Sequence, residues 1–178
     1  MTRRWLLVLL LACGASALWG QAADTPVLEV QQSTGFVEVL LPELGWRQAV
    51  IGRQVPAGSV MTAWLDATAR LAYGDSILTL DRLSHVKVID ISASLIRLSV
   101  EAGGITIEVP TTACEIEFRG MVIRVEKGKA SLGDDSLAVQ SGSAVVQGAG
   151  PQPLPVAAGA KIALLSPAAG PIFAGASR

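Results

Sequence analysis

The sequence predicts an all-β protein with a single domain of about a dozen short strands, arranged as an irregular β-sandwich or a solenoid-like stack. The first observation is composition, because 18 glycines and 9 prolines in 178 residues interrupt the chain often. A helical bundle would contain more Leu, Glu and Lys and fewer glycines. The second observation is that apolar residues alternate with polar ones, while no window after the N-terminal segment keeps the 3.6-residue period of a helix.

The first 22 residues have the three-part layout of a secretory signal peptide. Arg3 and Arg4 precede an apolar run over residues 5–12, which is shorter than the roughly 20 residues of a membrane span. Gly20 and Ala22 place small residues at the two positions that a signal peptidase reads, which fits cleavage after Ala22, and residues 15–17 offer a second candidate. We therefore expect a periplasmic or secreted protein, with an ordinary Sec signal favoured because the apolar run is so hydrophobic.

Three alternatives for this segment remain open. It could stay as an uncleaved anchor, Cys13 could be a lipidation site, or "TRRWLL" could be a twin-arginine signal. Cleavage after Ala22 would remove two positive charges and change the formal charge from −1 to about −3. It would also leave Cys114 as the only cysteine, so an exported domain would form no internal disulfide.

The predicted strands start at Gly35, after a polar lead-in over residues 23–34. Each is a run of about four to seven residues, rich in Val and Ile and bounded by Gly, Pro, Asp or Ser. The runs are "GFVEVLL", "ATARLAY", "HVKVIDI", "LIRLSV", "GITIEV", "CEIEF" and "MVIRVE". The segments "YGDS" and "GDDS" predict hairpin turns, since Asp and Gly favour turns. Residues 166–178 form a tail rich in Pro, Gly and Ala, which we expect to be poorly ordered.

Few side chains could carry chemistry. His85 is the only histidine, so with Cys114 it supplies too few ligands for a zinc site. A Ser-His-Asp set exists in composition only, from Ser84 or Ser99 with His85 and Asp81, and no nucleophile-elbow motif is present. We expect a structural histidine, no catalytic residue, no cofactor and no metal site; a secreted hydrolase is the weakest alternative.

Cys114 lies in an alternating strand with Ile116 and Phe118 on the same face. The pattern predicts a buried, unreactive thiol that packs as a small hydrophobe. The alternative is a redox-active or intermolecular thiol.

The carboxylates carry little functional signal. Asp66, Asp75, Asp81 and Asp90 could supply a pair for glycoside hydrolysis, but any all-β chain has such pairs. The "GDDS" segment at residues 133–136 lacks the later oxygen ligands of a calcium loop. We expect this segment to be a turn.

Three large amphipathic aromatics follow the leader: Trp46, Trp64 and Tyr73. They could stack on a sugar, but in a chain with so few aromatics we expect the core to contain them.

The order of glycines and strands provides a further argument. The segments that carry it are "GFV", "GRQVPAGSVMT", "ARLAYGDSILTL", "IRLSVEAGGITIEV", "VPTTACEIEFRGMVIRV", "LAVQSGSAVVQG" and "LPVAAGAKIAL". In this order over residues 35–165, they resemble the FecR domain, an extracytoplasmic all-β domain. Ala63 stands where the family often has Gly, and Met121 where it has Thr.

The resemblance implies an all-β fold outside the cytoplasm and a role in envelope signalling. Members with an anti-sigma role place a cytoplasmic segment before a membrane helix, whereas about four residues precede the apolar run here. We therefore expect a stand-alone exported member that contacts no sigma factor itself.

These observations predict a non-enzymatic exported module that binds a protein partner or a cell-envelope component. The alternative is a carbohydrate- or peptidoglycan-binding module. The near-neutral charge argues against nucleic acid, and membrane contact is expected only through a retained or lipidated N-terminal signal. For the binding mode, we predict that the glycine-rich residues 128–148 form an open strand edge that accepts a strand from the partner.

Overall fold

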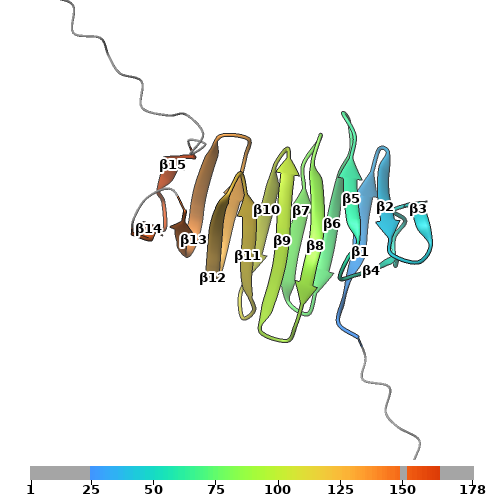
Figure 1. Ribbon diagram of the computed structural model, residues 1–178, viewed down its shortest axis with the longest axis horizontal. Helices are drawn as coiled ribbons and strands as arrows, with labels where there is room; N and C mark the ends of the chain where they lie inside the picture. The colour runs from blue at the N-terminus through green and yellow to red at the C-terminus, as the bar shows by residue number, and fades with distance from the viewer. Residues whose placement is uncertain (1–24, 149–151, 165–178) are drawn as a thin grey trace, which may run out of the picture.

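The chain folds into fifteen β-strands of one curled mixed sheet in the computed structural model, which describes residues 25–148 and 152–164 (Figure 1). The strands are β1 (Val27–Thr34), β2 (Val37–Leu41), β3 (Gly45–Gln48), β4 (Gln54–Pro56), β5 (Val60–Ala63), β6 (Thr68–Tyr73), β7 (Ser76–Leu80), β8 (His85–Ile91), β9 (Leu95–Ala102), β10 (Ile105–Val109), β11 (Ala113–Phe118), β12 (Met121–Leu132), β13 (Ser136–Gln147), β14 (Leu154–Ala157) and β15 (Lys161–Ala163). The all-β prediction is confirmed. The predicted signal peptide and tail lie outside the described residues.

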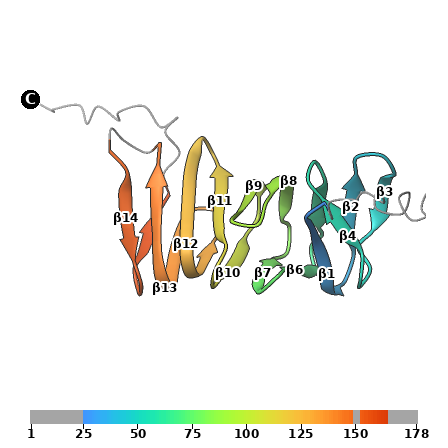
Figure 2. The same ribbon diagram turned by 90° about the horizontal axis from the view of Figure 1, so that it is seen from below.

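The sheet curls into two facing layers (Figure 2). One layer has the order β3-β2-β5-β8-β9-β11 and the other has the order β4-β1-β6-β7-β10, while β12 lies between β11 and β10 and joins the two. Only β9 and β11 pair in parallel among the described strands. Strands β1–β4 lie at one end of the long axis and β13–β15 at the other (Figure 1). No helix within the described ranges is long and apolar enough to cross a membrane.

Because apolar and polar residues alternate, every second side chain of a strand points into the space between the two layers. Val37, Val39 and Leu41 of β2 are buried, as are Cys114, Ile116 and Phe118 of β11. The predicted inward position of the thiol is confirmed. Burial, together with the charge of the neighbouring Glu115 carboxylate, raises the pKa of the Cys114 thiol to about 12.

The turns also form where the acidic and glycine residues predicted them. Tyr73 pairs with Ser76 across the two-residue connection of β6 and β7. The Gly133 N–H donates to the Ser136 carbonyl at 2.8 Å in the turn between β12 and β13. The segment considered as half of a calcium loop is therefore a hairpin turn.

The lead-in contains a strand that its polar composition concealed. Within residues 23–34, β1 pairs with β4 and β6, and Leu28 and Val30 are fully buried. Two inward side chains are sufficient to anchor this strand, because its other positions face outward and can be polar.

Strands β12 and β13 form the corner at which the sheet curls. The first half of β12 pairs with β11 and the second half with β10, with register shifts on either side of residues 127–129. Gly128 and Gly142 lie opposite each other at this bend, both with positive φ. A Cβ at Gly128 would overlap the Ser141 carbonyl, and a Cβ at Gly142 would overlap the Lys127 carbonyl. These glycines let two backbones approach closely at the bend.

The prediction of an open edge over residues 128–148 is wrong. Strand β13 pairs with β12 on one side and with β14 and β15 on the other, so its backbone groups are largely used within the fold. Glycine-rich composition fits a bend as well as an edge, and only the pairing on both sides distinguishes them.

The strands with a single partner among those described are β3, β4, β14 and β15. All are short, and each carries a residue that discourages further pairing. Arg47 of β3 lies opposite the buried Val39, β4 contains Pro56, β14 contains Pro155, and β15 begins at Lys161. Charged residues and prolines at such positions block the addition of another strand.

Candidate binding face

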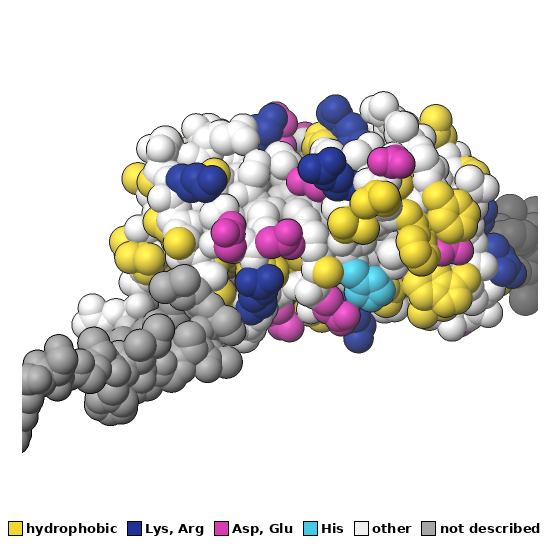
Figure 3. All heavy atoms as spheres, turned by 90° about the horizontal axis from the view of Figure 1, so that it is seen from above, with side chains coloured by type: hydrophobic (Ala, Val, Ile, Leu, Met, Phe, Trp, Pro, Cys, Tyr) yellow, Lys and Arg dark blue, Asp and Glu magenta, His cyan; other side chains and the backbone are white. Residues whose placement is uncertain are grey.

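Large apolar side chains are exposed mainly in the half of the molecule that contains β1–β8. Eight of the nine that are exposed among the described residues lie within residues 36–83, and the ninth is Leu154. Figure 3 shows such side chains gathered beside the histidine, drawn in cyan. Contiguous exposed apolar surface of this kind marks interaction sites more often than scattered single residues do.

The aromatic face, as we name it, consists of Phe36, Trp46 and Trp64 on the outer side of β2, β3 and β5. Phe36 immediately precedes β2, and because Val37 and Val39 point inward, Phe36 is directed outward. Trp46 of β3 lies opposite Leu40, the outward residue of β2. The exposed fractions of Phe36, Trp46 and Trp64 are 52%, 47% and 51%.

Two contacts fix the orientation of Trp64. Its ring centroid lies 6.2 Å from that of Phe36, with 43° between the ring planes. Its Nε1–H donates to Glu38 Oε2 at 3.2 Å. The indole is therefore held at the surface with its polar edge satisfied and much of its apolar area accessible.

Polar groups border the aromatic face on β5, β8 and β9. His85 Nδ1 lies 2.9 Å from Thr62 Oγ1, and His85 Nε2 lies 3.6 Å from Glu101 Oε2. These groups lie at the strand ends near Trp64, because Thr62 and His85 are paired across β5 and β8. An apolar centre with a polar border is the usual organisation of a protein interface.

The structure gives the two serines of the Ser-His-Asp alternative neighbours other than His85. Ser84 is fully buried, donates from Oγ to the Gly104 carbonyl and accepts from the Gly104 N–H at 3.2 Å. Ser99 lies opposite Lys87 in the β8–β9 pairing. Burial raises the pKa of Asp81.

The four aspartates considered for glycoside hydrolysis do not come together as a set. Asp75 accepts from Thr111 Oγ1 at 2.9 Å, and Asp90 lies within β8. Asp66 and Asp81 line one shallow hollow of about 500 Å³. Within the described residues, no group of three or more His, Cys, Asp or Glu side chains could hold a metal ion.

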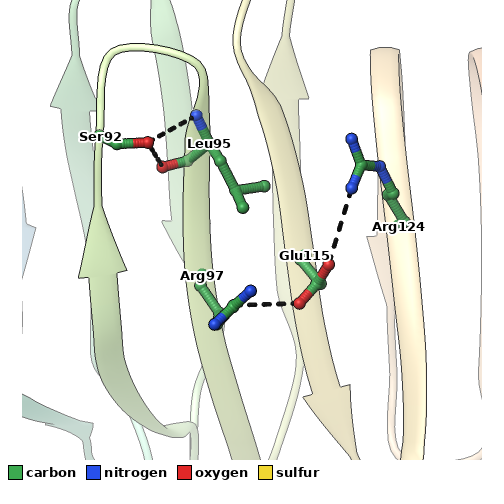
Figure 4. Close-up of polar contacts among 5 residues, drawn as sticks. All are labelled: Ser92, Leu95, Arg97, Glu115 and Arg124. Atoms are coloured by element: carbon green, nitrogen blue, oxygen red, sulfur yellow. Dashed lines mark hydrogen bonds and ion pairs between the residues drawn. The ribbon is translucent and has the colours of Figure 1, made fainter.

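Farther along the same layer, the outer surface is occupied by ion pairs (Figure 4). Glu115 of β11 lies between two arginines: Arg97 Nε is 3.0 Å from Oε1 and Arg124 Nη1 is 3.8 Å from Oε2. The side chain of Glu115 is 17% exposed. We name Arg97, Glu115 and Arg124 the ion-pair ladder; sequence reasoning missed it because the partners come from three strands.

The expectation that the core contains the large aromatics is wrong for both tryptophans. Tyr73 is partly buried and packs against the core, whereas Trp46 and Trp64 lie on the surface. The sequence did hold a signal for this face. In "GFVEVLL", buried Val37 and Val39 require that Phe36 point to the opposite side.

Neither known protein families nor curated proteins match the chain by sequence. Two crystal structures, each described as a "putative anti-sigma factor" from Parabacteroides distasonis, are similar to it. The structure at 1.65 Å has a TM-score of 0.53 and 11% identity, over 61% of this chain and 56% of that chain. The structure at 2.50 Å has a TM-score of 0.39 and 10% identity, over 80% of this chain and 55% of that chain. This chain thus spans just over half of each protein, and the first likeness establishes a shared fold.

Proposed function

We propose that this protein is an exported, non-enzymatic, FecR-like module that binds a protein partner through the aromatic face. The motif order over residues 35–165 supports the FecR assignment. The fold shared with a structure described as a "putative anti-sigma factor" is consistent with a role in envelope signalling. Because that protein is only 11% identical, the signalling role and the partner are parts of the proposal.

The observation that carries the proposal is the exposure of three large aromatics together. Each leaves about half of its surface in water, whereas the inward Val37, Val39 and Met61 of the same layer are buried. Aromatic side chains of this kind dominate the binding energy of protein interfaces when a partner covers them. Glu38 and His85 would then contribute to the polar rim.

A carbohydrate partner is the second candidate, favoured by the exposure of Trp46 and Trp64 on one outer surface. Sugar rings stack on flat aromatic platforms. Phe36 and Trp64 are instead inclined by 43°, and neither tryptophan lines the hollow that contains Asp66 and Asp81. This geometry fits the irregular side chains of a protein better than a flat sugar.

Site-specific photo-cross-linking in the producing cell tests the protein partner. A photoreactive amino acid replaces Phe36 or Trp46 in separate variants, and the control replaces Gln147, an exposed residue of β13 in the other half. We expect a discrete protein adduct from the first two variants and a much weaker one from the control. Equal adducts from all three, or none from the aromatic face, would contradict the proposal.

Titration with soluble peptidoglycan fragments distinguishes the second candidate. Binding of a sugar to the indoles would change tryptophan fluorescence, and Trp46→Phe and Trp64→Phe would each remove part of this change. We expect no saturable change. A saturable fluorescence change in the wild-type protein that either variant weakens would show that the aromatic face binds a sugar and would contradict the protein partner.

The expected export is tested by sequencing the N-terminus of the protein recovered from the envelope or medium. The charged start, short apolar run and small residues predict a chain that begins after Ala22. An intact Met1 or a lipid-modified Cys13 would contradict the proposed leader.

A further inference from the structure

A hollow of about 790 Å³ lies at the end of the molecule that β1–β4 form. The β2–β3 turn lines one side through Leu41 and Leu44, and the loop before β4 lines the other through Val50 and Ile51. This volume lies within the range of small-molecule sites, about 300–1,000 Å³. The lining is mostly aliphatic and contains no aromatic side chain, in contrast to the neighbouring aromatic face.

Backbone hydrogen bonds hold the loop that forms one wall. The Gly52 N–H donates to the Val30 carbonyl at 2.8 Å, and the Val30 N–H donates to the Arg53 carbonyl at 2.9 Å. The Arg53 N–H donates to the Val50 carbonyl at 3.0 Å. The loop is thus anchored to β1, so its exposed Val50 and Ile51 side chains are positioned before any ligand arrives.

Arg53 supplies a cationic group at this hollow. Its side chain is partly buried, and its Nε is shielded from solvent without a hydrogen-bond partner among the described residues. Glu43 also lines the hollow, yet no ion pair forms between it and Arg53. Because Arg53 lines the hollow and has no carboxylate partner among the described residues, its guanidinium favours a ligand that brings a carboxylate.

We propose that this hollow binds an aliphatic carboxylate, a small molecule with an apolar chain and one anionic head. The carboxylate accepts hydrogen bonds from Arg53, and the chain lies against Leu44, Val50 and Ile51. A peptide strand is the weaker candidate, because Arg47 and Pro56 discourage strand addition at the two edges that flank the hollow. This inference is independent of the aromatic face and its partner.

Isothermal titration calorimetry with decanoate, and with decanamide as the uncharged match, tests the charge requirement on the purified wild-type protein. We expect saturable binding of decanoate that is at least about tenfold tighter than that of decanamide, a difference of about 1.4 kcal/mol. Equal affinity for the two, or no saturable heat with decanoate, would overturn the proposal.

Three variants then locate the site. Arg53→Gln should weaken decanoate binding at least about tenfold and leave decanamide binding unchanged. Ile51→Ser should weaken both ligands, and its side chain is 71% exposed, so the fold should tolerate it. The control is Arg47→Gln. Arg47 carries the same charge but does not line the hollow, and its Nη1 donates to the Trp46 carbonyl. A loss of decanoate affinity in the control equal to that in Arg53→Gln would assign the effect to general surface charge and overturn the site.

Discussion

The outer surface of one layer differs between its two halves. Over β9, β11 and the adjoining half of β12, the charged groups of the ion-pair ladder are paired with one another, with Glu115 between Arg97 and Arg124 (Figure 4). Over β2, β3 and β5, the aromatic face leaves Phe36, Trp46 and Trp64 half in water (Figure 3).

The inward sides of both halves are alike, since Val37 and Val39 of β2 and Ile116 of β11 are all buried. The inward residues therefore determine the fold, and the outward residues distinguish a self-contained surface from one that is available to a partner. If this comparison is correct, changes in the ladder half should affect stability and changes in the aromatic half should affect binding.

The largest expected effect concerns the corner next to the ladder half. Gly142→Ala should cost about 3–5 kcal/mol of unfolding free energy, because the left-handed backbone conformation and the overlap with the Lys127 carbonyl add together. Gly45→Ala is the matched control in the aromatic half: Gly45 also has positive φ, yet beyond its chain neighbours no atom lies within 4 Å of the position that a Cβ would take there. It should cost only about 1–2 kcal/mol.

Urea denaturation followed by circular dichroism measures both glycine variants. Equal losses would show that the corner is not closely packed, and would remove this difference between the halves.

The next effect concerns Cys114, which lies beneath the ladder. Cys114→Ser should cost about 1–3 kcal/mol, because a hydroxyl would be buried in place of a small apolar group. The native thiol should react slowly with a thiol reagent and rapidly in denaturant. Rapid labelling of the native protein would contradict the inward position of this side chain.

The raised thiol pKa also predicts a pH dependence. Since the pKa rises from its ordinary value near 9 to about 12 on folding, the unfolded chain ionises first as pH increases. The contribution to stability is therefore complete below about pH 9 and declines between about pH 9 and 12, by at most about 1.4 kcal/mol per pH unit. Subtracting the same curve for Cys114→Ala isolates it from other groups. If the stability of Cys114→Ala declines with pH in the same way as that of wild type, the thiol makes no such contribution.

A smaller effect is expected from the ladder. Glu115→Gln should lower stability by about 1 kcal/mol, because the arginines it pairs with are partly exposed to solvent and screened. Glu38→Gln in the aromatic half, which loses one surface hydrogen bond to Trp64, should cost less than about 0.5 kcal/mol. Denaturation in low and high salt measures the stability of both variants. High salt should bring only the Glu115→Gln variant to the stability of wild type. A larger loss from Glu38→Gln would reverse the comparison.

Sequence reasoning reached the strands, the turns and the buried Cys114 because these follow from local alternation and turn chemistry. It missed β1, where two inward residues, Leu28 and Val30, anchor a polar strand. It also assigned residues 128–148 to an edge. Whether a glycine-rich strand bends or pairs depends on neighbours distant in the sequence, and here β14 and β15 cover it.

The candidate site was only partly predictable for a related reason. Alternation shows that Phe36 and Val37 face opposite sides, but not which other aromatics share the outer side. That Phe36 lies beside Trp64 follows from the pairing of β2 with β5. The ladder likewise requires the parallel pairing of β9 with β11, which no local pattern indicates.

The most direct test of the central claim is the affinity of the cross-linked partner for matched variants of the two halves. A Phe36→Ser/Trp64→Ser variant should lose at least about tenfold in affinity while its fold, checked by circular dichroism, is retained. An Arg97→Gln/Arg124→Gln variant should bind within about twofold of wild type, since the ladder is expected to support stability only. Equal affinity of the aromatic variant and wild type, or a larger loss from the ladder variant, would contradict the account.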